Sequence, residues 1–153
     1  AKNNVTYSLM RACALTGNKL SIACPKNKEY YPAEKFIKET KRLEKKHKGK
    51  ITITQRPEVA VRGADIIYTD SWMSYRIPQK EKERRINGLK KYQVNKTLFK
   101  KAKKKTLFMH CLPAMRGHEV TKEIIDSKAS IVFPQAQNRL HIQKSILLSL
   151  MGR

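Results

Sequence analysis

Residues 108–120, FMHCLPAMRGHEV, gather several side chains that can do chemistry within a short stretch. His110 and Cys111 stand side by side at the end of an apolar run, and a proline follows shortly after them. A thiol in this position can serve a reaction, bind a metal or simply lie buried at a strand end, as free cysteines usually do. Because His110, Cys111 and His118 lack the regular spacing of zinc ligands, we expect no metal here.

Two further polar clusters follow apolar runs, TDSW at residues 69–72 and QAQNR at residues 135–139. The carboxylate of Asp70 can accept hydrogen bonds from an ammonium group, although aspartate also forms turns with its own backbone. The guanidinium of Arg139 can stabilise negative charge that develops on a carbonyl oxygen, or it can pair with solvent or with Glu119. Whether these residues act together depends on the elements that carry them.

Short apolar runs alternate with longer amphipathic stretches along the chain. The apolar runs predict strands at residues 19–24, 50–55, 64–70, 106–111 and 130–135. The amphipathic stretches predict helices at residues 3–17, 32–49, 57–63, 78–92, 95–104, 119–127 and 138–152. Asn3 or Asn4 can cap the first of these helices. The alternation indicates an α/β fold, a three-layer sandwich with a mostly parallel, Rossmann-like sheet that is covered on both faces.

In such a sheet, ligands bind just beyond the carboxyl ends of the strands. The TDSW, HCLPAMRG and QAQNR segments all follow predicted strands, so we expect them to converge on one crevice. The first predicted helix has no strand before it, although the first strand of a doubly wound sheet is commonly central. We therefore expect the first strand to be missing from this chain, and the chain to be a piece of a longer protein.

The composition allows one domain with a real core, since 40% of the residues are hydrophobic. The net charge of +22 attracts polyanions, but the excess is mostly lysine on amphipathic stretches without interleaved aromatic residues or a nucleic-acid-binding motif. No apolar stretch approaches the roughly 20 residues that span a bilayer. Three cysteines without a CxxC pair, and no signal-peptide pattern, suit a reducing compartment. We expect a cytoplasmic protein with no nucleic-acid or membrane partner.

Four segments stand in a specific order: NNV opening a helix, DSWMS after a strand, HCLPAMRGHEVT after the next strand, and QAQNRLHIQK opening the last helix. With them the chain resembles the second, amino-acid-binding half of the ornithine carbamoyltransferases, over essentially all 153 residues. The resemblance implies transfer of the carbamoyl group of carbamoyl phosphate to the side-chain amine of L-ornithine, giving citrulline and phosphate. It also implies no cofactor, a homotrimer or a multiple of trimers, and a first half, absent here, that binds phosphate through a Ser-Thr-Arg-Thr loop.

The resemblance further implies which residues form the site. Cys111 matches the family's active-site cysteine, and Leu112 would offer its backbone carbonyl to the carbamoyl amide. Arg139 matches the arginine that contacts the carbamoyl oxygen, so Cys111 and Arg139 are the expected catalytic residues. The positions that match the family's amino-acid-binding residues are Asn4, Asp70 and Ser74.

Two places depart from the family pattern. Gln137 stands where the family usually has an acid, which affects a supporting salt bridge. Tyr75 and Arg76 stand where the ornithine enzymes usually have Met-Gly, in the loop that closes over the amino acid. Tyr75 can narrow the pocket or contact the substrate, and Arg76 would repel a diamine and attract an amino acid. This favours ornithine over putrescine or lysine as the substrate.

Several alternatives stay open at this point. Arg116 is either a residue that braces its loop or an anion contact. The domain is either half of a carbamoyltransferase, for ornithine or another amine, or a non-catalytic amino-acid-binding module, because the phosphate-binding loop is absent. A basic nucleic-acid-binding domain is a third class, which rests on charge alone.

Overall fold

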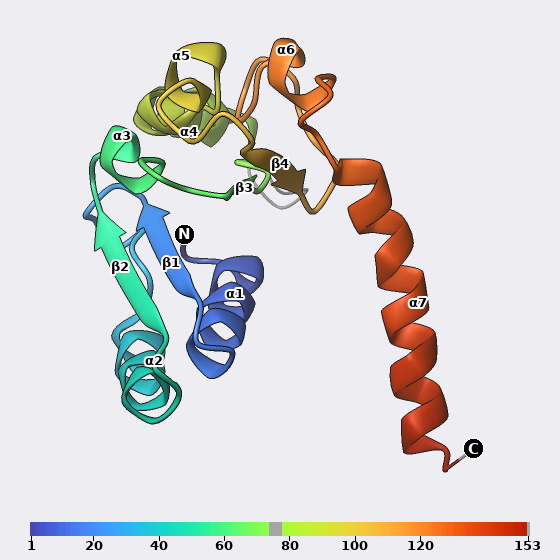
Figure 1. The fold of residues 1–153 in the computed structure, drawn as a ribbon. Coiled ribbons are helices and arrows are strands. Elements are labelled where there is room, and N and C mark those ends of the chain that lie inside the picture. Colours follow the sequence, from blue (N-terminus) through green and yellow to red (C-terminus); the bar gives the residue numbers. More distant parts are fainter. Residues whose placement is uncertain (74–77, 153) are drawn as a thin grey trace.

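The computed structural model describes residues 1–73 and 78–152. Helices alternate with parallel strands along the chain, which confirms the predicted α/β fold (Figure 1). The elements are, in chain order, α1 (Asn4–Leu15), β1 (Lys19–Ala23), α2 (Glu34–His47), β2 (Lys50–Thr54), α3 (Pro57–Ala60), β3 (Ile66–Thr69), α4 (Gln79–Leu89), the 3₁₀ helix η1 (Lys90–Tyr92), α5 (Lys96–Phe99), β4 (Leu107–His110), α6 (Lys122–Ile125) and α7 (Val132–Leu150).

The strands form two parallel pairs. Strand β1 lies beside β2 with Lys19 opposite Lys50, and β3 lies beside β4 with Thr69 opposite His110. Within the described residues no backbone ladder joins the two pairs, whereas the sequence predicts one sheet.

The strand predicted at residues 130–135 is wrong. A single parallel bridge between Ser130 and Phe108 takes its place, and α7 begins two residues later. Pro134 explains this outcome: it would interrupt a strand ladder, but in the first turn of a helix it loses no hydrogen bond, because the first N–H groups have no helical partner. The helix predicted at residues 138–152 therefore begins earlier, and the QAQNR segment lies inside it rather than in a loop.

Apolar clusters hold each strand pair in place. The cluster around β3 and β4 has the buried members Val61, Ile67, Val94, Leu98, Phe108, Val120, Ile124, Ile125 and Val132. A second cluster packs α1 and α2 against β1 and β2, with Met10, Ile22 and Cys24 at its centre. Phe108 is fully buried in the first cluster, so the residues that follow β4 start from a rigid anchor.

Helix α7 lies largely outside these clusters. Val132 is buried, but the apolar side chains further along the helix are exposed, namely Phe133, Leu140, Ile142, Ile146, Leu147, Leu148 and Leu150. Figure 1 shows α7 projecting away from the rest of the molecule. Among the described residues, no helix combines the length and apolar character needed to cross a membrane.

Gly49 permits the close approach of α1 to the turn between α2 and β2. A Cβ at this position would lie 2.7 Å from the Cα of Ala14 and 2.9 Å from the backbone oxygen of Cys13. Because backbone atoms cannot move aside, we expect Gly49→Ala to lower the free energy of unfolding by about 1–3 kcal/mol in urea titrations. Gly88→Ala is the matched control: its Cβ would meet nothing closer than 3.9 Å, and alanine should add about 0.5–1 kcal/mol in α4. Equal midpoints for Gly49→Ala and wild type would contradict the close packing.

Candidate active site

Asp70 and Cys111 meet because β3 and β4 are parallel and in register. Thr69 lies opposite His110, so the next residue of each strand leaves the same edge of the pair. The thiol of Cys111 donates to Oδ1 of Asp70 at 2.8 Å, and the amide of Ser71 donates to the same oxygen at 2.7 Å. A carboxylate and a thiol thus stand together beyond the carboxyl ends of two parallel strands, where ligands bind in sheets of this kind.

The electrostatic setting keeps the thiol of Cys111 protonated. Burial raises its pKa, and the hydrogen bond to Asp70 and the charge of that carboxylate raise it further, to about 12. Since the thiolate is the nucleophilic form, a thiol with this pKa is a poor nucleophile at neutral pH. Cys111 is therefore a hydrogen-bond donor next to a carboxylate, and not an activated nucleophile.

Leu112 has an unusual backbone conformation directly after this cysteine. Its φ is +56°, and the following Leu112–Pro113 peptide bond is cis. A branched residue in the left-handed region costs about 1–3 kcal/mol and needs support from its surroundings. The amide of Leu112 donates to Nδ1 of His110 at 2.8 Å, which supplies part of that support.

Gln135, in the first turn of α7, ties this helix to both strands. Its Oε1 accepts from the backbone amide of His110 at 3.1 Å, and its Nε2 donates to the hydroxyl of Tyr68 at 3.0 Å. From the sequence, Gln135 is predicted to end a strand, and no individual role is predicted for it. The signal that could have found it is the polar QAQNR cluster, of which Gln135 is the first member.

Asn4 and Arg139 make no side-chain hydrogen bond with Asp70 or Cys111 in the part of the chain that the structure describes. Asn3 caps α1 by accepting from the amide of Thr6 at 2.8 Å, so Asn4 is free of that task and is exposed in the first turn. Arg139 is exposed on α7, and its guanidinium forms no hydrogen bond or ion pair with any residue that the structure describes. Ser74, Tyr75 and Arg76 lie outside the described residues.

Arg116 braces its own loop, which is one of the two roles left open for it. Its guanidinium donates to the carboxylate of Asp126 at 2.6 and 3.2 Å, and both side chains are partly exposed. The side-chain hydrogen bond between them raises the pKa of Arg116 and lowers that of Asp126. In residues 1–73 and 78–152, no group of three or more His, Cys, Asp or Glu side chains is arranged to hold a metal ion.

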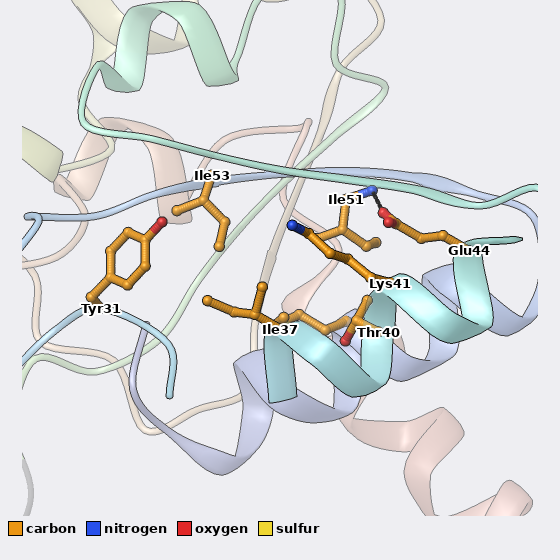
Figure 2. A pocket seen from close by; sticks show the side chains of 8 residues that line it. Tyr31, Ile37, Thr40, Lys41, Glu44, Ile51 and Ile53 are labelled. Carbon is orange, nitrogen blue, oxygen red and sulfur yellow. Dashed lines mark hydrogen bonds between the residues drawn. The ribbon is translucent and has the colours of Figure 1, made fainter. Parts of the chain in front are cut away.

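The described part of the chain also has two hollows away from Asp70 and Cys111. One, of about 210 Å³, lies between α2 and strand β2, and Figure 2 shows Ile37, Ile51 and Ile53 facing it, with Lys41 and Glu44 nearby. The Glu44 carboxylate accepts from the amide of Ile51, which ties the outer edge of β2 to α2. The other, of about 430 Å³, is lined by residues near the start of α2. Neither hollow contains a predicted site residue.

Comparison with known proteins decides the family. A sequence model described as "Aspartate/ornithine carbamoyltransferase, Asp/Orn binding domain" matches residues 1–150. The chain belongs to this family. The ornithine carbamoyltransferase of Methanosarcina acetivorans is 44% identical over 97% of the chain and 47% of its own length. That of Geobacillus stearothermophilus is 45% identical over 97% of the chain and 47% of its own length.

The fold agrees with solved carbamoyltransferases. The ornithine carbamoyltransferase from Pyrococcus furiosus matches this chain with a TM-score of 0.88 at 44% identity, over 95% of this chain and 46% of that one. This chain therefore spans about half the length of the carbamoyltransferases it matches.

The protonated thiol of this carbamoyltransferase domain gives a direct test. At pH 8, a pKa of about 12 leaves a thiolate fraction of about 10⁻⁴, against roughly a quarter for an ordinary cysteine. We expect iodoacetamide to alkylate Cys111 at least about a hundredfold more slowly in the native than in the urea-unfolded protein, as measured by peptide mass spectrometry. Asp70→Asn should quicken the native reaction, because it removes two of the causes that raise the pKa. Equal native and unfolded rates would refute the assignment.

Proposed function

We propose that this chain is the amino-acid-binding domain, residues 1–153, of an ornithine carbamoyltransferase. The complete protein transfers the carbamoyl group of carbamoyl phosphate to the side-chain amine of L-ornithine, and the products are citrulline and phosphate. The observation that carries the proposal is the Asp70–Cys111 contact at the carboxyl edge of β3 and β4, in a chain whose relatives are named ornithine carbamoyltransferases. Carbamoyl phosphate binds mainly to the half of the enzyme that this chain does not span.

The proposed roles follow the chemistry of each side chain. The Asp70 carboxylate accepts from the α-ammonium of ornithine, and the amide of Asn4 donates to its α-carboxylate. The Cys111 thiol and the Leu112 carbonyl face the amine and the carbamoyl amide. Arg139 stabilises the carbamoyl oxygen as negative charge develops on it. Ser74 binds the amino acid, and Tyr75 contacts it or narrows its pocket.

Deprotonation of the amine is the chemical problem that the site must solve. An alkylammonium group with a pKa of about 10.4 is almost wholly protonated at neutral pH and cannot attack a carbonyl. A buried site that excludes water favours the neutral amine, and the remaining acceleration comes from alignment of amine and carbonyl. A protonated Cys111 supports this mechanism, because direct attack by the amine needs no covalent enzyme intermediate.

The assembly and location are part of the same proposal. We place the complete enzyme in the cytoplasm as a homotrimer or a multiple of trimers. The exposed apolar side chains of α7 are compatible with burial in a larger assembly.

A citrulline assay tests the reaction and the amine together. We expect the complete protein to form citrulline from carbamoyl phosphate and L-ornithine, and residues 1–153 alone to form none, since the phosphate-binding half is missing. The ratio kcat/KM should be higher for ornithine than for putrescine, because putrescine brings no carboxylate for Asn4. It should also be higher than for lysine, because the relatives are named ornithine carbamoyltransferases. A higher kcat/KM for putrescine than for ornithine would show that putrescine is the substrate. If none of the three amines is carbamoylated, the domain is instead a non-catalytic amino-acid-binding module.

Truncation of Cys111 tests its role in the complete enzyme. We expect Cys111→Ala to lower kcat by at least about tenfold, a barrier change of about 1.4 kcal/mol, because the donor beside the reacting amine is lost. Cys13→Ala is the matched control: this half-buried cysteine of α1 is not part of the proposed site, and kcat should stay unchanged. If Cys111→Ala turns over like wild type while remaining folded, Cys111 is only a buried thiol.

A further inference from the structure

Gln135 seats the start of α7 on the strands of the candidate site. The segment before the helix runs along β4: the amide of Phe108 donates to the carbonyl of Ala129 at 2.8 Å, and the amide of Ile131 donates to the carbonyl of Phe108 at 3.0 Å. The helix begins with the next residue. Gln135 is half-buried, whereas the other residues from 133 to 140 are exposed. Gln135 therefore holds these first turns of the helix against the strands.

The side-chain amide of Gln135 bridges both strands. Its Oε1 accepts from the backbone amide of His110 at 3.1 Å, and its Nε2 donates to the hydroxyl of Tyr68 at 3.0 Å. Tyr68 and Asp70 are two residues apart in an extended segment, so their side chains leave the same face of it. Burial raises the pKa of Tyr68, and the nearby Cys111 and Asp70 raise it further. The bridge therefore stands on the face of the strands that carries the Asp70–Cys111 pair.

Arg139 lies one helical turn beyond this bridge. Four residues advance a helix by about 6 Å and return to nearly the same face, so Arg139 follows Gln135 on one side of α7. The Cα–Cβ bonds of a helix tilt toward its N-terminus, so the Arg139 side chain leaves the backbone in the direction of the bridge. The position of Arg139 relative to Asp70 and Cys111 is therefore set by how Gln135 seats the helix.

We propose that Gln135 is a positioning residue for Arg139 in carbamoyl transfer. By bridging Tyr68 and the backbone of His110, its amide seats α7 so that the Arg139 guanidinium stabilises the carbamoyl oxygen in the transition state. This inference rests on the proposed function and extends it to two side chains, those of Gln135 and Tyr68, to which that function assigns no role. The competing possibility is that the bridge only stabilises the fold.

The test uses the complete protein and the variant Gln135→Leu. Leucine has a similar size but makes neither hydrogen bond. We expect kcat to fall by at least about tenfold, because a small displacement of a catalytic group is costly. The KM for L-ornithine should stay within about twofold, because Asn4 and Asp70 are unchanged. Gln143→Leu is the matched control: the same change at an exposed position of α7 should leave kcat within about twofold of wild type.

A double-mutant cycle with Arg139→Ala separates positioning from stability. If Gln135 acts through Arg139, then Gln135→Leu should lower kcat by less than about twofold in the Arg139→Ala background, because the group that it positions is already gone. A bridge that only stabilises the fold would give losses of kcat that multiply in the double variant. Multiplied losses, or a folded Gln135→Leu with wild-type kcat, overturn the inference.

The variant Gln135→Glu covers the case in which Gln135→Leu does not fold. Glutamate keeps an acceptor for the His110 amide, and its other oxygen accepts from the Tyr68 hydroxyl, so kcat should stay within about threefold of wild type. Adding Tyr68→Phe removes that hydroxyl, and kcat should fall at least about tenfold below the product of the two single effects. Circular dichroism reports whether each variant is folded. Independent single effects, or failure of all these variants to fold, overturn the inference.

Hydrogen exchange gives a readout that does not depend on turnover. In Gln135→Leu the amide of His110 loses its acceptor, and we expect it to exchange at least about tenfold faster than in wild type, as measured by mass spectrometry. In Gln143→Leu the rate should not change. A wild-type rate in Gln135→Leu overturns the inference. Faster exchange in a protein whose wild type makes no citrulline would support the bridge and reject the proposed function, and with it the role of Gln135 in positioning Arg139.

Discussion

The ladder between β3 and β4 is the constraint on which the candidate site depends. Ile67 lies opposite Phe108 in this ladder, and both side chains are buried in the same apolar cluster. A shift of one residue would turn these side chains to the other face of the pair, so burial enforces the register. The same register brings Asp70 beside Cys111. The packing of two apolar residues thus sets the distance between two polar ones.

The polar pair then acquires its properties from its surroundings. A thiol near water and near cations ionises readily, whereas the Cys111 thiol is partly buried and faces a carboxylate. Both influences raise its pKa in the same direction. The result is a donor that stays neutral at physiological pH. A neutral thiol fits the proposed reaction, in which a substrate amine attacks and no covalent enzyme intermediate forms.

Two side-chain contacts of a carboxylate hold the loop after β4, and their environments differ. Arg116 and Asp126 pair at the surface, where water and salt weaken the attraction. Glu119 and His110 pair in the core, where an unpartnered carboxylate would be expensive to keep. The strained backbone at Leu112 lies next to the buried pair. The buried contact between Glu119 and His110 therefore lies next to Leu112, whose left-handed backbone conformation needs support.

Local patterns in the sequence determined much of this protein. The apolar runs located β1 to β4, the amphipathic stretches located α1, α2 and α4, and the order of the NNV, DSWMS, HCLPAMRGHEVT and QAQNRLHIQK segments identified the family. These features are readable because strand and helix periodicity, and family motifs, are properties of neighbouring residues. The site roles of the predicted residues stay predictions, namely those of Asn4, Asp70, Ser74, Tyr75, Cys111, Leu112 and Arg139.

Tertiary structure decided what local patterns could not. The apolar run before Pro134 is compatible with a strand and with a helix. In the folded chain only Ser130 pairs with Phe108, and α7 begins at Val132. The Asp70–Cys111 contact joins residues 41 positions apart, so it exists only through the register of two strands. Glu119 looked like an ordinary acid in a polar segment, and its burial against His110 became visible only in the folded chain. Sequence patterns specify which elements form, whereas contacts between distant elements depend on how those elements bury their apolar faces together.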